Sequence, residues 1–236
     1  MVIKKSTSFV LNVVDKCIMQ DNMKLKLKYR NWRYMKSLLY PNWIETPIYD
    51  SDWYDDIYQN EKSYHVNYKD SPYYLIWKEI SDRISNNNIV KVLDIGCGPG
   101  QFAALLLDNG VTNYTGLDFS STAIDIAKIN CKDGNFIIGD AKKSDVYETV
   151  QYEAIVCTEV LEHIDDDLAV IARFPTGIHC FCTVPNFSCN GHVRFFNNEN
   201  EVRDRYNKYF SSFSVVTLSG KRFEDEKYFL IDGIRN

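Results

Sequence analysis

The feature that most constrains the fold is the run Val92-Leu93-Asp94-Ile95, followed by alternating glycines at positions 96, 98 and 100. Apolar residues without alternation predict a central parallel strand that is buried on both faces. Glycine has no Cβ, so the loop behind this strand can turn sharply and bring its backbone close to a ligand. Because Gln101 to Leu107 is apolar and helix-forming, the loop opens onto a helix N-terminus. This pattern indicates the ligand-binding corner of a doubly wound α/β fold.

The spacing of the loop disfavours a dinucleotide as the ligand. A dinucleotide fingerprint needs its third glycine at position 101, where this chain has Gln101. Asp94, directly before the loop, is poorly placed beside a pyrophosphate but suits a ligand that carries an amine and a sulfonium. A second predicted strand ends in Asp118, which we expect to accept hydrogen bonds from both ribose hydroxyls. A third strand is followed by Asp140, so we expect three acids at one edge of the sheet.

The ordered set VLDIGCGPG, GLDFS, GDA and VCTEVLEHI resembles class I S-adenosylmethionine-dependent methyltransferases, from about Tyr64 to the C-terminus. The resemblance implies a Rossmann-like, doubly wound α/β fold with a seven-stranded mixed sheet whose last strand is antiparallel. It also implies two regions, an N-terminal accessory and lid region over 1–88 and a methyltransferase core over 89–236. The strands are expected near 90–95, 113–118, 135–138, 152–157, 178–184, 212–218 and 227–234.

S-adenosyl-L-methionine is the cofactor that this resemblance implies. In this class the segment before the first core strand folds over the cofactor as a lid. We therefore expect the region Tyr64–Tyr74 to touch the methionine end of the cofactor or the acceptor, with plain aromatic packing as the alternative. This region leads into a helix expected over Leu75–Ile84, with Ser71 as its cap. The expected cofactor-binding residues are Tyr64, Tyr68, Asp94, Gly96, Cys97, Gly98, Gly100, Gln101, Asp118, Phe119, Ser120, Asp140, Ala141, Thr158 and Glu159.

The segment after the fourth predicted strand carries the candidate chemistry. On a helical turn, Glu159, Glu162 and His163 would fall at i, i+3 and i+4 and share one face. His192 follows the next strand, so its loop leaves the same edge of the sheet. These four residues could hold a divalent cation such as Mg, Mn, Fe, Co or Zn. A cation there would lower the pKa of an acceptor hydroxyl and fix its oxygen in line with the methyl group.

Two groups of metal-assisted O-methyltransferases resemble this stretch. The ubiquinone-pathway enzymes share the Glu-x-x-Glu-His run, and the small-RNA 3′-terminal 2′-O-methyltransferases add a later histidine. In the small-RNA enzymes, the last loop has a richer pattern of histidines and aromatic residues than the segment Gly191–Arg194 has in this chain. The same run also occurs in metal-free members, where the first glutamate packs beside the cofactor and the histidine is a general base or structural. The candidate catalytic residues are therefore His163, Glu159 and His192. Arg194 could hold an acidic group of the acceptor or pair with a nearby acid.

Composition favours a single soluble enzyme domain in a reducing compartment. The chain has 236 residues, of which 45% are hydrophobic and 25% charged, as in ordinary globular proteins. No run approaches 18 apolar residues, so we expect no membrane span, and the first residues do not match a signal peptide. The seven cysteines lack metal-finger spacing and are expected to be reduced thiols of a cytoplasmic protein.

Basic residues are concentrated at the start of an acidic chain. The first 40 residues hold nine basic residues against two acids, and the densest run, 24–36, interleaves cations with aromatics. This run could contact phosphate, RNA or an anionic membrane, but the formal net charge of −5 favours a merely solvated face. We expect O-methylation of a small-molecule or glycan hydroxyl. The alternatives are RNA 2′-O-methylation that uses the basic run as a grip, and a non-catalytic cofactor-binding partner subunit. The sequence leaves the oligomeric state open.

Overall fold

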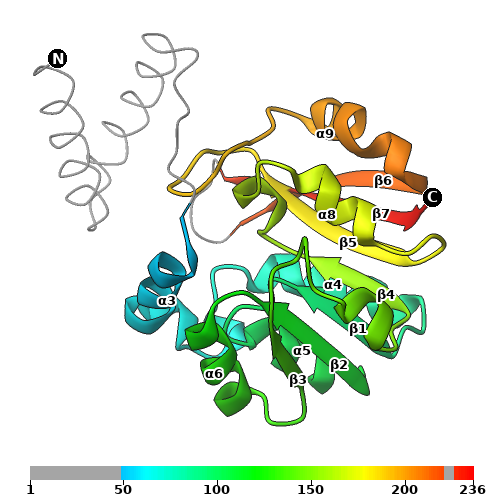
Figure 1. Cartoon of the computed structure of the whole chain (residues 1–236). Helices are drawn as coiled ribbons and strands as arrows, with labels where there is room; N and C mark the ends of the chain where they lie inside the picture. The colour runs from blue at the N-terminus through cyan, green and yellow to red at the C-terminus, as the bar shows by residue number, and fades with distance from the viewer. Residues whose placement is uncertain (1–48, 221–225) are drawn as a thin grey trace, which may run out of the picture. The chain divides into compact units, whose positions relative to one another are not determined.

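The structure, a computed structural model, describes residues 49–220 and 226–236 (Figure 1). The chain divides into two compact units, Met1–Glu45 and Thr46–Asn236, and all that follows concerns the second. The basic run 24–36, and with it the proposed grip on RNA, lies outside the described residues. Within the described ranges, every helix is too short or too polar to cross a membrane.

A seven-stranded sheet forms the centre of this unit, in the order β3-β2-β1-β4-β5-β7-β6. The five strands from β3 to β5 are parallel, and β7 lies antiparallel between β5 and β6. The predicted Rossmann-like mixed sheet with an antiparallel last strand is confirmed. The strands are β1 (Lys91–Ile95), β2 (Asn113–Asp118), β3 (Asn135–Ile138), β4 (Ala154–Cys157), β5 (His179–Pro185), β6 (Phe210–Ser219) and β7 (Lys227–Arg235).

Helices cover both faces of the sheet, and successive residues of the strands serve opposite cores (Figure 1). On β1, Val92 packs with α4, α5 and α6, whereas Leu93 packs with α7, α8 and α9 on the other face. This arrangement explains why β1 has no polar alternation, because both of its faces are buried. The helices are α3 (Ser51–Asn60), α4 (Tyr74–Asn86), α5 (Gln101–Asp108), α6 (Ser121–Asn130), α7 (Val146–Thr149), α8 (Asp167–Arg173) and α9 (Glu199–Tyr206), with 3₁₀ turns η1 (Lys62–Tyr64), η2 (Tyr68–Asp70), η3 (Leu161–His163) and η4 (Asn207–Tyr209).

Helix starts follow local capping chemistry, with one correction to the sequence prediction. The Ser120 hydroxyl accepts a hydrogen bond from the N–H of Ala123 at 3.0 Å and caps α6. Ser71 was expected to cap α4 in the same way. Instead its hydroxyl accepts from the N–H of Tyr73 at 3.2 Å, and α4 begins one residue later at Tyr74, without a side-chain cap. Ser71 therefore stabilises the turn that delivers the chain into α4.

The order of the strands reverses between β1 and β4, which are neighbours although β2 and β3 separate them in sequence. In open α/β sheets this reversal opens a crevice at the carboxyl ends of the strands. The glycine loop after β1 and the loops after β4 and β5 all leave from that edge. The fold thus brings the two halves of the predicted site to one place.

Candidate active site

The glycine loop after β1 packs tightly against the loop after β4. Gly96, Gly98 and Gly100 all have positive φ, at 78°, 52° and 78°. A Cβ on Gly96 would lie only 2.2 Å from Cγ2 of Val160, so a side chain there would push the two loops apart. Both the backbone conformation and the close contact therefore require glycine at position 96.

Asp94 has one carboxylate oxygen without a partner. Its Oδ2 accepts a hydrogen bond from the Tyr114 hydroxyl at 2.6 Å. Its Oδ1 is buried and has no hydrogen-bond partner among the described residues. Burial raises the pKa of Asp94 to about 7. A buried oxygen that lacks a donor carries a free-energy penalty, and an ammonium group of a ligand would relieve it. The residue thus fits the amine end of the expected cofactor.

Asp118, at the end of β2, closes the other side of the loop. Its Oδ2 accepts from the Gly98 N–H and its Oδ1 from the Ser120 N–H, both at 2.9 Å. Burial raises the pKa of this carboxyl to about 6. Phe119 follows directly and is 40% exposed, which leaves an apolar ring at the edge of the crevice. The role of Asp118 as acceptor for ribose hydroxyls stays a prediction, and its place at the end of β2 beside the glycine loop is compatible with it.

Four of the other expected cofactor residues lie in or beside the loops at the carboxyl ends of the strands. Cys97 and Thr158 are buried beside the glycine loop and β4, and Asp140 and Ala141 lie half-buried in the loop after β3. The side-chain amide of Gln101 is engaged by the segment that precedes α4. Its Nε2 donates to the carbonyls of Ser63 and Val66, at 3.1 and 2.7 Å. Gln101 therefore fastens the segment before α4 onto α5.

Tyr68 is placed differently from the prediction. Its hydroxyl donates to Oδ2 of Asp108 at 2.6 Å, and its ring is buried in the core beside α4 and α5. Asp108 is the last residue of α5, whereas the glycine loop precedes the first residue of that helix. The prediction that Tyr68 contacts the cofactor is therefore wrong for this structure, because core packing takes its ring to the far end of α5.

Helix α3, which precedes the predicted lid region Tyr64–Tyr74, also brings aromatic rings to the glycine loop. A Cβ on Gly98 would lie 3.5 Å from the Tyr58 hydroxyl oxygen, so Tyr58 rests against that loop. The ring of Tyr64 meets Tyr58 edge-on at 4.8 Å. One turn earlier on α3, the ring centroid of Tyr54 lies 5.9 Å from that of His163. The run of tyrosines and acids over 49–58 was visible in the sequence, but it gave no sign of which rings would reach the site.

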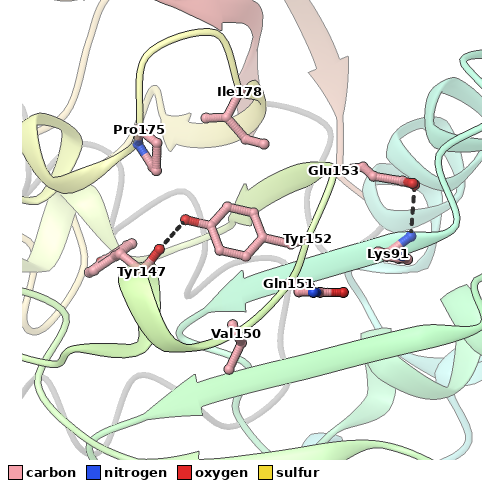
Figure 2. A pocket seen from close by; sticks show the side chains of 8 residues that line it. All are labelled: Lys91, Tyr147, Val150, Gln151, Tyr152, Glu153, Pro175 and Ile178. Atoms are coloured by element: carbon pink, nitrogen blue, oxygen red, sulfur yellow. Dashed lines mark hydrogen bonds between the residues drawn. The ribbon is translucent and has the colours of Figure 1, made fainter.

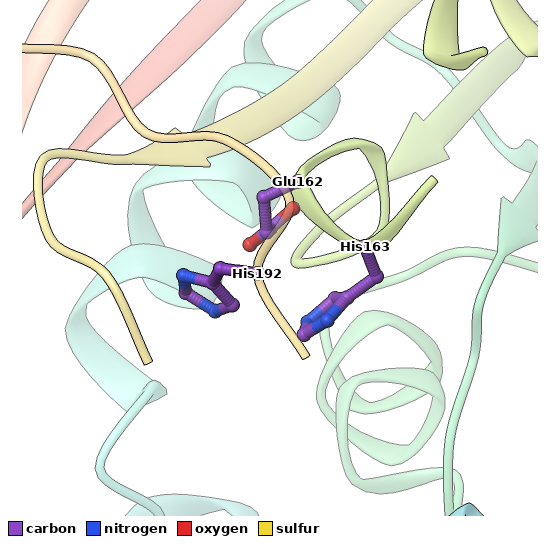
Figure 3. Close-up of side chains that lie close together, drawn as sticks. All are labelled: Glu162, His163 and His192. Atoms are coloured by element: carbon purple, nitrogen blue, oxygen red, sulfur yellow. The ribbon is translucent and has the colours of Figure 1, made fainter. Parts of the chain in front are cut away.

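Glu162, His163 and His192 converge where the loops after β4 and β5 meet (Figure 3). One possible ligand atom from each residue lies within 4.8 Å of the others. Glu162 is 0% exposed, and neither of its carboxylate oxygens has a hydrogen-bond partner among the described residues. Figure 3 shows the two imidazole rings on either side of this carboxylate. Burial raises the pKa of Glu162, and the nearby Glu159 raises it further.

Backbone carbonyls orient both histidines of this group. Nδ1 of His163 lies 3.0 Å from the Gly191 carbonyl oxygen, and Nδ1 of His192 lies 3.1 Å from that of Phe187. A carbonyl oxygen only accepts hydrogen bonds, so each Nδ1 carries a proton, and in a neutral ring this leaves the lone pair on Nε2. Burial and the nearby His192 lower the pKa of His163 to about 3, so its ring is neutral. A carbonyl behind a neutral imidazole is the usual second layer of a metal site.

Glu159 does not share a helical face with Glu162 and His163. Its φ is 58°, and the 3₁₀ turn η3 begins only at Leu161. The Thr183 hydroxyl lies 3.0 Å from both the Glu159 N–H and the Glu159 Oε1, and holds this residue against β5. The predicted one-face arrangement is therefore wrong, because a left-handed residue redirects the chain before the turn. Glu159 lies outside the group of three potential metal ligands.

A separate hollow lies at the opposite edge of the sheet (Figure 2). Lys91 at the start of β1 and Ile178 just before β5 line it, together with Tyr147 and Tyr152. The Tyr152 hydroxyl donates to the Tyr147 carbonyl at 2.7 Å. The amino ends of the strands meet here, so this hollow is remote from the glycine loop and the histidines.

Comparisons with known proteins agree with this fold. A sequence family described as a methyltransferase domain matches residues 65–220. A ubiquinone biosynthesis O-methyltransferase of Actinobacillus pleuropneumoniae is 30% identical over 108 residues, which are 40% of this chain and 45% of that protein. Its counterpart from Escherichia fergusonii is 32% identical over 85 residues, 34% of this chain and 35% of that protein. The chain thus spans less than half the length of these curated relatives.

Two solved structures share the architecture. The N-methyltransferase NodS from Bradyrhizobium japonicum WM9, in complex with S-adenosyl-L-homocysteine, has a TM-score of 0.62 at 17% identity, covering 79% of this chain and 98% of that one. The methyltransferase domain of bacterial CtHen1-C has a TM-score of 0.55 at 17% identity, covering 69% of this chain and 98% of that one. At this identity the likeness concerns the fold.

Proposed function

The chain belongs to the methyltransferase domain family, whose cofactor is S-adenosylmethionine, and from that premise we propose that it methylates a hydroxyl oxygen held beside a divalent cation. The observation that carries the proposal is the buried Glu162 carboxylate, which has no hydrogen-bond partner among the described residues and lies between the imidazoles of His163 and His192. Such a carboxylate is costly in a protein interior unless a cation or a donor accompanies it.

The cofactor would lie along the carboxyl edge of β1 and β2. Asp94 offers its unpartnered oxygen to the amine, and Asp118 offers its carboxylate to the ribose hydroxyls. When bound, the cofactor supplies an electrophilic methyl group on a sulfonium. The role of the chain is to hold that group, to exclude water from it with Tyr58 and Tyr54 of α3, and to present the acceptor oxygen.

The metal-ligand proposal assigns Glu162, His163 and His192 to the cation. Mixed imidazole and carboxylate donors suit Mn, Fe, Co or Zn, and also accept Mg. A cation held there would lower the pKa of an acceptor hydroxyl. The alternative role for His163, a metal-free general base, is less well supported, because a pKa of about 3 is far from the operating pH of a base.

The surroundings of these three residues favour a neutral acceptor. The ring centroid of Tyr54 lies 5.9 Å from that of His163, and the ring centroid of Phe187 lies 5.6 Å from that of His192. Aromatic rings therefore border both histidines. Glu159 adds a second buried carboxyl near Glu162, and burial raises its pKa to about 8, so it offers an anionic acceptor no positive partner. These features support a small-molecule or glycan hydroxyl as the substrate class.

The test is metal binding by the purified protein after treatment with a chelator. We expect the wild-type protein to bind Mn²⁺, with the binding measured by electron paramagnetic resonance. Glu162→Gln should lower the Mn²⁺ affinity at least about 10-fold. The affinity for S-adenosylhomocysteine, measured by calorimetry, should stay within about two-fold in both proteins, because other loops hold it. Wild-type protein that binds S-adenosylhomocysteine but no Mn²⁺, and no Zn²⁺ or Co²⁺ in parallel titrations, would overturn the metal proposal.

A second candidate, RNA 2′-O-methylation, is favoured by one observation. His192 joins Glu162 and His163, and a later histidine is the feature that the small-RNA enzymes add to the shared run. A single-stranded RNA with a free 3′-terminal 2′-hydroxyl would test it in a binding series from about 50 to 200 mM salt. Affinity that falls steeply with salt would support this candidate, since phosphate contacts release counterions. Absence of RNA binding at the lowest salt would eliminate it.

A further inference from the structure

The loop after β5 carries an arginine whose guanidinium is directed into the protein. Arg194 follows His192 by two residues, and its side chain is only 15% exposed. Its Nη1 donates to the carbonyls of Leu161 and Ile164, and its Nη2 donates to the carbonyl of Asp165 at 2.6 Å. These carbonyls surround the C-terminal end of η3, where a helix leaves its acceptors unsatisfied and favours a cation.

A buried anion holds the other side of this guanidinium. Nη2 of Arg194 lies 3.4 Å from Oδ1 of Asp167, which is 0% exposed at the start of α8. Asp167 also accepts from Nε of Arg205 at 2.9 Å and from the Tyr206 hydroxyl at 2.6 Å, both on α9. Arg194 is therefore committed to protein groups on two sides. This contact pattern supports the ion-pair alternative for Arg194 over a grip on the acceptor.

Backbone hydrogen bonds connect the same two segments close to the potential ligands. The N–H of Val193 donates to the carbonyl of Glu162 at 2.7 Å, and Nδ1–H of His163 donates to that of Gly191. Glu162 and His163 belong to one loop and His192 to another, so their spacing depends on how these loops are joined. Arg194 adds to this connection between the two loops, because it bonds three carbonyls that flank Glu162 and His163 in the chain.

We propose that Arg194 is a positioning residue that fixes the distance between the η3 turn and the loop bearing His192. This inference rests on the proposed function, because the site that Arg194 positions is the proposed metal site. A planar guanidinium can bond several carbonyls and a carboxylate together, whereas a lysine ammonium is a point donor on a flexible stem. Arg194→Lys should therefore keep the charge but lose the geometry.

The experiment compares Arg194→Lys and Arg194→Ala with Arg205→Lys as the matched control. Arg205 bonds the same Asp167 but none of the η3 carbonyls. We expect Mn²⁺ affinity to fall about 10-fold in Arg194→Lys and up to about 100-fold in Arg194→Ala, and to change less than two-fold in Arg205→Lys. Methyl transfer should recover in part at high Mn²⁺. The affinity for S-adenosylhomocysteine should be unchanged in all three variants. An unchanged affinity shows that the variant is folded.

The outcomes separate this inference from the proposed function. If wild-type protein binds Mn²⁺ and Arg194→Lys binds it equally tightly, the positioning role is wrong while the metal site stands. An equal loss in Arg194→Lys and Arg205→Lys would also overturn it, because the effect would then come from Asp167 alone. Failure of wild-type protein to bind any of the metals would remove the proposed function and this inference together. If Arg194→Ala does not fold, the two lysine variants decide.

Discussion

The carboxylate of Asp55 accepts a hydrogen bond at 3.1 Å from the backbone N–H of Thr122, 67 residues further along the chain. The same carboxylate also accepts from the hydroxyls of Ser120 and Ser121. The bond from Ser120 lowers the pKa of Asp55. An anion at the start of α6 satisfies N–H groups that the helix itself leaves free. Asp55 thereby docks α3 beside the site.

Asp55→Ala should lower the free energy of unfolding by about 1 kcal/mol at pH 7, as the loss of a helix cap does. Because folding lowers the pKa of this acid, its contribution is present above the unfolded pKa of about 4 and is lost as the pH falls below it. Denaturant unfolding at pH 7 and at about pH 2.5, below the unfolded pKa, measures both effects. Asp55→Asn, which keeps an acceptor, should lose less. Equal stability of wild type and Asp55→Ala would show that this contact does not dock α3.

Removal of the Glu162 charge should change stability in opposite directions with and without metal. In chelated protein, Glu162→Gln should raise the free energy of unfolding by about 1–2 kcal/mol, because the buried Glu162 carboxyl has no hydrogen-bond partner in the described part of the chain. With Mn²⁺ present, wild-type protein should gain more thermal stability than Glu162→Gln, since a ligand stabilises the state that binds it in proportion to the logarithm of its affinity. Thermal unfolding with and without Mn²⁺ measures both.

Glu159→Gln is the control for that experiment. Glu159 lies outside the three potential ligands, and a glutamine there keeps an acceptor for the Thr183 hydroxyl. The variant should retain the stabilisation by Mn²⁺. Loss of that stabilisation in Glu159→Gln would restore Glu159 to the ligand set and contradict the assignment from geometry.

The affinity for S-adenosylhomocysteine should increase with pH between about 5 and 7. Burial raises the pKa of Asp94 to about 7 in the free protein, so the carboxylate that pairs with the ligand amine forms only as the pH rises. Because the pKa of Asp94 is higher in the folded than in the unfolded protein, the ligand-free protein loses the contribution of Asp94 to stability as the pH rises through about 7. Calorimetry at several pH values measures the affinity. Asp94→Asn should bind about 10-fold more weakly and with a flatter profile, while an unchanged profile would dissociate Asp94 from the ligand.

Gly96→Ala and Gly110→Ala compare two glycines with positive φ. A Cβ on Gly110 would have no atom within 4 Å, whereas one on Gly96 would lie 2.2 Å from Cγ2 of Val160. Backbone strain should cost each variant about 1–2 kcal/mol of stability. Gly96→Ala should lose at least about 1 kcal/mol more and should weaken S-adenosylhomocysteine binding. Val160→Ala should restore part of that extra loss in the double variant, and strict additivity would argue against the contact.

The sequence determined the sheet and the acidic edge of the candidate site. Strands that are buried on both faces lack alternation, so the apolar run before Asp94 marked the centre of the sheet without any long-range information. The acid at the end of β2, Asp118, followed from the same logic, because carboxyl ends of parallel strands share one edge. The nearness of His192 to the Glu162–His163 pair followed from the same edge, since β4 and β5 are neighbours.

Tertiary structure alone decided which side chains enter the site. Glu159 leaves the ligand group because its positive φ turns the chain before η3, and a helical spacing rule cannot foresee a left-handed residue. Tyr68 goes to Asp108 and Tyr58 to the glycine loop, although both are tyrosines in the same aromatic region. Arg194 turns inward because carbonyls at the end of η3 and a buried Asp167 attract it together. Local sequence determines elements and edges, because backbone sterics and periodicity act over a few residues. The final contacts depend on packing between segments that are far apart in the chain.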